Sequence, residues 1–175
     1  MANRTLKSYP TKIDQFRVRE EIDVTRWLTE TGVTRGFFHR IRAGHDFSID
    51  TLLRLVRSAR RITGKDVHAV DIADLGEDAL PGVAAAAGTR RAPRPARYDT
   101  PLDRWIASRG ITPAEVARAA RISKPTLLKM RKGQMTRNGV VVITTSTLAA
   151  VVRALRRLTA EDVRAADVSG IEELR

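Results

Sequence analysis

Apolar residues recur at spacings of three and four along most of this chain, which is the period of a buried helix face. The clearest examples are Leu102, Trp105 and Ile106, and later Leu148, Val151, Val152 and Leu155. Aromatic residues make up 5% of the chain, while Ala, Leu, Val and Arg abound. This mixture favours helices over strands, so we expect an all-α fold.

The starts of the expected helices carry residues that accept backbone N–H groups at the N-cap. Thr112-Pro113-Ala114-Glu115 is a capping box with proline at the first helical position. Ser123 is expected to cap a helix over 124–132, which Gly133 ends. We expect a further helix to begin near 145–147 and the last one at Thr159, where Thr-Ala-Glu-Asp has the form of a capped start.

The N-terminal half follows the same plan. Ile13 and Phe16 mark a first helix, and Asp23 is expected to cap a second. A third helix is predicted over 35–42, and Ser48 opens a fourth. A fifth helix is expected after Thr63-Gly64.

An internal repeat relates the two halves. At an offset of 89 residues, Ile13-Asp14-Gln15-Phe16 aligns with Leu102-Asp103-Arg104-Trp105. Past Gly44 and Gly133 the offset becomes 96, because the second copy carries seven extra residues. Matches over about sixty positions with one insertion are not expected by chance. The sequence therefore predicts two domains, 10–79 and 99–175, joined by a basic Pro/Gly/Arg linker over 80–98.

Two segments leave alternatives open. The linker is either a solvated spacer or a basic arm that lies along a phosphate backbone or in a minor groove. The insertion contains Asn138-Gly139 followed by a valine run, which favours a small β-hairpin in the second domain. Arg137 and Asn138 at its tip are candidates for contact with phosphate or a groove edge, unless the insertion only covers the core.

Charge adds a partner class to this picture. The net charge is +12, with +2 in residues 1–88 and +10 in residues 89–175. Such an excess indicates a polyanionic partner, usually nucleic acid or an anionic membrane surface. Two arginine clusters in the predicted fourth and fifth helices are either solvated helix faces or sources of salt-sensitive affinity: Arg54, Arg57, Arg60 and Arg61, then Arg153, Arg156 and Arg157.

Other functional classes receive no support. There is no cysteine, and His39, His45 and His68 lack metal-ligand spacing. No apolar stretch approaches the roughly 18–20 residues that a membrane span needs, and the N-terminus lacks a signal-peptide core. Paired carboxylates, nucleophile constellations and phosphate loops are missing too. We therefore expect a cytoplasmic protein that is not an enzyme and uses no cofactor.

Each half resembles the Cro/CI repressor-type (Xre-like) helix-turn-helix family. The resemblance rests on 23–44 and 112–133, where a capped short helix, a turn and a second helix end in a glycine. The first turn reads Gly32-Val33-Thr34-Arg35, whereas Arg121 stands where the family usually has glycine in the second. Val24 and Pro113 also replace a frequent family glutamine. The resemblance implies two tandem lambda-repressor-like five-helix domains and sequence-specific double-stranded DNA binding by a transcriptional regulator.

The family places the second helix of each pair in the major groove. With Phe38, Ile41, Leu127 and Met130 inward, the outward positions become the candidate DNA-binding residues. They are Thr34, Arg35, Gly36, Phe37, His39, Arg40, Ser123, Lys124, Thr126, Leu128, Lys129 and Lys132, with Arg137 and Asn138 from the insertion.

Arg35 and Lys124 are candidates for guanine contacts, with phosphate binding as the alternative. Thr126 is a candidate for a thymine methyl or an adenine, and His39 for a base or a phosphate. Phe37 and Leu128 are apolar, and contact with thymine methyls, partial burial and a protein interface are all compatible with that. The two predicted reading helices differ in sequence, so the half-sites should be unlike and one chain would act as a covalent pseudo-dimer.

Two functions compete with this reading. One is a protein-interaction regulator, for example an anti-activator, that keeps the fold and binds a protein partner. The other is a non-specific architectural DNA binder. A homodimer also remains open as a form of the molecule.

Overall fold

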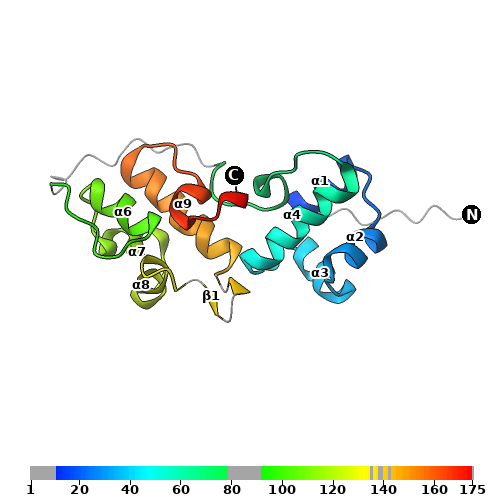
Figure 1. The fold of residues 1–175 in the computed structure, drawn as a ribbon, viewed down its shortest axis with the longest axis horizontal. Coiled ribbons are helices and arrows are strands. Elements are labelled where there is room, and N and C mark those ends of the chain that lie inside the picture. The colour runs from blue at the N-terminus through cyan, green and yellow to red at the C-terminus, as the bar shows by residue number, and fades with distance from the viewer. Residues whose placement is uncertain (1–10, 79–91, 135, 138–139, 142, 175) are drawn as a thin grey trace, which may run out of the picture.

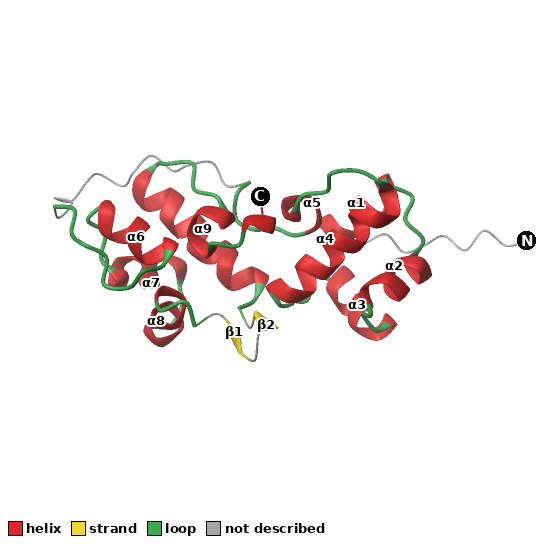
Figure 2. Cartoon of the chain, viewed as in Figure 1, coloured by secondary structure: helices red, strands yellow, loops and turns green. Residues whose placement is uncertain are grey.

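The computed structural model describes residues 11–78, 92–134, 136–137, 140–141 and 143–174. Within these ranges the chain forms ten α-helices, one 3-10 helix and two strands of two residues each. Figures 1 and 2 show an elongated molecule with two groups of helices side by side. We call helices α1–α5 the N-terminal unit and α6–α10 the C-terminal unit.

The N-terminal unit is built around one tryptophan. Its helices are α1 (Lys12–Arg19), α2 (Val24–Thr31), α3 (Arg35–Arg42), α4 (Ile49–Thr63) and α5 (Ala69–Ile72). Trp27 is fully buried, with its ring centroid 6.0 Å from that of Phe16 and 5.4 Å from that of Phe38. Its Nε1–H donates to Ser58 Oγ at 2.8 Å, so the polar end of the indole is satisfied inside the core.

The C-terminal unit has a similar layout with an aliphatic core. Its elements are α6 (Pro101–Ser108), α7 (Pro113–Ala120), α8 (Lys124–Arg131), β1 (Thr136–Arg137), β2 (Val140–Val141), α9 (Thr145–Thr159), α10 (Ala165–Ser169) and the 3-10 helix η1 (Glu172–Leu174). Val116 and Ala154 are fully buried at the positions equivalent to Trp27 and Ser58. The strands pair antiparallel between α8 and α9, with residue 136 opposite 141.

The same buried ion pair ties the first and third helices of both units. Arg42 Nε lies 2.7 Å from Asp14 Oδ1, and Arg131 Nε lies 2.5 Å from Asp103 Oδ1. Both carboxylates are almost fully buried. Because the two pairs are related by the offset of 89, each unit holds its third helix in the same way.

The prediction that Thr159 starts the last helix is wrong. Thr159 is the final residue of α9, and its hydroxyl donates to the Leu155 carbonyl at 2.8 Å. Ala160 then ends the helix in the left-handed region at φ +58°. The last α-helix is α10, which begins at Ala165. A threonine hydroxyl bonds backward within a helix as readily as it caps one, so the sequence pattern was ambiguous.

The two units meet at the segments that precede α4 and α9. Residues 47–49 and 143–145 pair through an antiparallel bridge centred on Ser48 and Thr144. Two reciprocal N–H···O hydrogen bonds, 3.0 and 2.9 Å long, flank this bridge. These positions are related by the offset of 96, so the same contact is made in both directions. The junction therefore has approximate two-fold symmetry.

Side chains extend this junction. The Asp46 carboxylate accepts from Thr145 Oγ1 at 2.7 Å, and from the N–H and hydroxyl of Ser146 at 3.0 and 2.5 Å. It thus supplies the first turn of α9 with an extra cap from the other unit. Two ion pairs add to the contact, Arg57 with Glu173 at 2.6 Å and Arg153 with Asp74 at 2.8 Å.

This arrangement places α3 and α8 on the same side of the molecule. In Figures 1 and 2 both lie along the lower edge, with β1 and β2 between them. The outer faces of α3 and α8 thus belong to a single edge of the protein.

Candidate nucleic-acid interface

Two pairs of short helices build the candidate site, α2 with α3 and α7 with α8. Gly32 ends α2 at φ +66° and Arg121 ends α7 at φ +55°, both in the left-handed region. Ser123 then caps α8, as predicted, and Thr34 caps α3 in the same way. Each side chain accepts the N–H three residues on, at 3.3 Å for Thr34 and 3.2 Å for Ser123.

The predicted starts of α2 and α7 are confirmed as well. Asp23 accepts the N–H of Arg26 at 2.8 Å. Thr112 donates its N–H to the Glu115 carboxylate at 2.6 Å and accepts the N–H of Glu115 at 3.3 Å, which completes the capping box. These caps fix where each helix begins and hence which side chains face outward.

The inward residues are buried as predicted: Phe38 and Ile41 in α3, and Leu127 and Met130 in α8. The other candidate residues lie on the outer faces. Thr34, Arg35, Gly36, His39, Arg40, Ser123, Lys124, Leu128, Lys129 and Lys132 are exposed, and Phe37 and Thr126 are half-buried. Arg137 lies in β1, and Asn138 falls outside the described residues.

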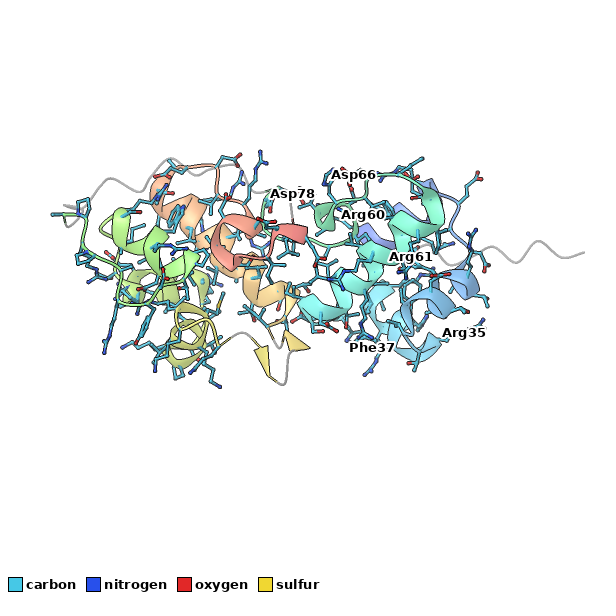
Figure 3. The ribbon with its side chains drawn as sticks, viewed as in Figure 1. Arg35, Phe37, Arg60, Arg61, Asp66 and Asp78 are labelled. Carbon is cyan, nitrogen blue, oxygen red and sulfur yellow. The ribbon has the colours of Figure 1, made fainter. Side chains whose placement is uncertain are left out.

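The outer face of α3 is polar and carries two arginines. An Arg35 Nη donates to Thr25 Oγ1 of α2 at 3.5 Å. Phe37 packs partly against the core, and the Arg40 guanidinium lies 5.5 Å from the centroid of its ring. Figure 3 shows Arg35 and Phe37 at the lower edge, and Arg60 and Asp66 in the upper half of the molecule.

The outer face of α8 is more strongly cationic and carries an exposed apolar residue. Lys124, Lys129 and Lys132 are exposed and form no ion pair with any carboxylate in the described ranges. Leu128 lies among them with 39% of its surface exposed. This face combines exposed positive charge with an apolar side chain, and the Lys132 ammonium also lies 5.8 Å from the centroid of the Tyr98 ring.

The arginines of α4 and α9 have structural partners, so the solvated-face and phosphate interpretations both need revision. Arg61 pairs with Glu30 at 3.2 Å, and Arg156 is buried and pairs with Asp162 at 2.7 Å. Arg157 donates to the carbonyl of Ala119 in α7 at 2.8 Å. Most of the positive charge on these helices is thus engaged in contacts within or between the two units.

The cations without a described carboxylate partner gather around the two helix pairs. Those on α2, α3, α7, α8 and their turns are Arg26, Arg35, Arg40, Arg118, Arg121, Lys124, Lys129 and Lys132, and the others are Arg94, Arg97, Arg157 and Arg164. Arg118 and Arg121 are not among the site residues predicted from the sequence. The position of Arg121 in the turn before α8 was a signal that could have indicated it.

The described part of the predicted linker, 92–98, contacts the C-terminal unit. Arg97 and Tyr98 donate their N–H groups to Asp103 Oδ2 at 2.7 and 2.8 Å. Burial raises the pKa of Asp103, but these hydrogen bonds and the Arg131 guanidinium outweigh it, so the pKa is lowered overall. The rest of that linker, 80–91, lies outside the described residues.

Two other kinds of site find no support where the structure describes the chain. No group of three or more His, Cys, Asp or Glu residues is arranged to hold a metal ion there. Among the described helices, none is long and apolar enough to cross a membrane.

Comparison with protein families matches residues 101–156 to the Cro/C1-type HTH DNA-binding domain. The chain thus contains one such domain, which covers α6–α8 and most of α9, while the N-terminal unit is similar in layout and is assigned to no family. Comparisons with curated proteins and with solved structures gave no match. An HTH domain of this type suggests DNA binding by a transcriptional regulator and is typical of regulators that are not enzymes.

Proposed function

We propose that this chain is a sequence-specific transcriptional regulator that binds double-stranded DNA through α3 and α8. The observation that carries the proposal is the outer face of α8. Lys124, Lys129 and Lys132 are exposed there, form no ion pair with a described carboxylate, and lie within the segment that matches the HTH family. Unpaired cations on such a helix suit the phosphates and base edges of a major groove.

We also propose that the two units together read two unlike half-sites. The support is geometric, since α3 and α8 lie along one edge and the junction between the units is nearly two-fold. Separate HTH chains achieve this by dimerising on half-sites about 34 Å apart. Here one chain carries both helices, and their outer residues differ, with Arg35 and His39 on α3 at the positions of Lys124 and Leu128 on α8.

Selection from a randomised duplex library tests both proposals. The full chain is bound at about 150 mM salt, and the retained DNA is sequenced. We expect an enriched motif with two different halves about one helical turn apart. Arg35→Ala should relax one half and Lys124→Ala the other, because each removes a candidate contact to guanine or phosphate.

Other outcomes would assign other functions. Tight binding without enrichment would indicate an architectural DNA binder, and relaxation of one half only would limit base reading to one unit. Absence of binding would contradict the proposal and favour a protein-interaction regulator, for which the exposed Leu128 is the supporting observation.

A further inference from the structure

The exposed leucine of α8 is unusual for the surface on which it lies. Leu128 and Val18 are the large hydrophobic residues that stay exposed in the described part of the chain, at 39% and 53%. Val18 lies on α1, outside both helix pairs, whereas Leu128 lies between Lys124 and Lys132. Packing in the core does not explain a leucine at position 128, because the side chain is exposed, and a leucine cannot bind phosphate.

Leu128 belongs to an apolar groove between α7 and α8. The groove has a volume of about 450 Å³, and Pro113 and Ala114 from α7 line it together with Pro125 and Leu128 from α8. Lys124 lies at its rim. The groove is thus open, mostly apolar and bordered by positive charge.

The equivalent surface of the N-terminal unit carries different residues. The positions equivalent to Pro125 and Leu128 are Gly36 and His39, and the position equivalent to Ala114 is Thr25, which hydrogen-bonds Arg35. The two helix pairs therefore present different chemistry, with a polar surface on α3 and an apolar strip on α8.

We propose that α8 recognises its half-site through the C5-methyl groups of thymines, which contact Leu128 and Pro125. The inference rests on the proposed DNA binding and names the base feature that one half of the site must carry. Thymine methyls are the apolar groups on base edges in the major groove, and apolar side chains recognise them by contact.

Charge complementarity selects this occupant. Lys124 lines the groove, and Lys129 and Lys132 are exposed nearby on α8. None of the three forms a described ion pair, and all are available to the phosphates that flank the bases. An apolar helix of a partner protein would leave these three charges without partners. A methyl-bearing groove edge of DNA satisfies both the charges and the apolar strip.

The test uses the duplex selected from the randomised library and the full chain. Each thymine of one half-site at a time is replaced by deoxyuridine, which removes the methyl and keeps the hydrogen-bonding groups. In the half read by α8, each contacted methyl should contribute about fourfold to affinity, the factor for burying one group of that size. In the half read by α3, the replacement should change little.

Three variants assign the effect to the groove. Leu128→Ala should shrink the difference in affinity between the thymine and deoxyuridine duplexes, with Pro125 keeping the remainder. Its far-UV circular dichroism should be unchanged because the side chain is exposed. Lys124→Ala should bind both duplexes more weakly and keep the difference between them. Val18→Ala, the matched control, should behave as the parent chain.

The outcomes separate this inference from the proposed function. A selected motif whose halves lack thymine overturns methyl reading and leaves DNA binding intact. So does a motif whose methyl dependence is absent or is not reduced by Leu128→Ala. If no duplex binds at all, both proposals fail, and the groove becomes a surface for a protein partner.

Discussion

Ser48 and Thr144 face each other across an antiparallel bridge, and each is the N-cap of a 15-residue helix, α4 in one unit and α9 in the other. Equivalent positions thus meet at the junction. The side chains around them are not equivalent, because Asp46 contacts Ser146, whereas the N-terminal residue equivalent to Ser146 is Asp50. Two N-terminal units paired in the same way would bring Asp46 toward Asp50, so the junction favours unlike units.

Asp46→Ala should weaken the junction and lower the free energy of unfolding by about 1 kcal/mol at pH 7, the usual value of a helix cap. Burial raises the pKa of Asp46, but the hydrogen bonds from Ser146 and Thr145 lower it by more. The pKa of Asp46 is therefore lowered overall. A carboxylate with a lowered pKa stabilises the fold above its unfolded pKa and loses that contribution as pH falls.

The difference between Asp46→Ala and the parent should therefore shrink below about pH 3.8, which urea denaturation at pH 7 and pH 3 would show. Asp50→Ala is the matched control, because the ion pair of Asp50 is with Arg54, one turn along the same helix, and does not cross the junction. Asp50→Ala should lower the free energy of unfolding by about 0.5 kcal/mol at both pH values. Equal losses for both variants would mean that Asp46 does not act across the junction.

Exchanging residues at the two left-handed turns should shift stability in opposite directions. Arg121→Gly relieves a non-glycine residue at φ +55° and should stabilise the chain by about 0.5 kcal/mol. Gly32→Ala, at the equivalent position, should cost about 1 kcal/mol through backbone strain alone, because an added Cβ would meet no atom within 4 Å. Urea denaturation measures both, and a destabilised Arg121→Gly would show that the Arg121 side chain matters more than its backbone.

Asp103→Asn should be strongly destabilising at pH 7, by about 3 kcal/mol, because it leaves the Arg131 guanidinium half-buried without its counter-ion. The lowered pKa of Asp103 means that its stabilising contribution is present above pH 3.8 and is lost as pH falls below it. The penalty should therefore be smaller at pH 3 than at pH 7.

Asp99→Asn is the comparison for that variant. Asp99 pairs with Arg104 but is highly exposed, and exposed pairs contribute about 0–1 kcal/mol. Similar costs for the two variants would contradict the structural role given to the buried pair.

Lys129→Ala should reduce the slope of log affinity against log salt by about 0.9, the value for one lost phosphate contact. Arg61→Ala removes the same charge from an arginine that pairs with Glu30, and it should leave the slope unchanged. Binding of the selected duplex across a salt series measures both. A slope that falls equally in the two variants would indicate a general charge effect and no contact at α8.

Local signals made much of the fold predictable. Four predicted N-caps are confirmed, because each cap depends on residues three positions away: Asp23, Ser48, Thr112 and Ser123. The failure at Thr159 arose where one threonine could bond forward or backward. The junction was not predictable, since Asp46 and Ser146 are 100 residues apart and no short-range pattern links them.

The candidate site was predictable to the level of helix faces. Spacing separated buried Phe38 and Leu127 from their outward neighbours. Spacing alone did not distinguish Phe37 from Leu128. Phe37 packs partly against the core, whereas Leu128 is exposed, and the difference depends on how α7 and α8 frame the groove. Arginine clusters were also misleading, since partners such as Glu173 for Arg57 lie 116 residues away.

The near-symmetric junction also bears on how such a molecule changes over generations. When two identical chains form a pair, every mutation appears on both sides of the axis and alters both halves at once. In this chain a codon change at Leu128 or His39 alters one half and leaves the other intact. Each half can therefore be selected separately, and an innovation on one side does not have to be tolerated on the other.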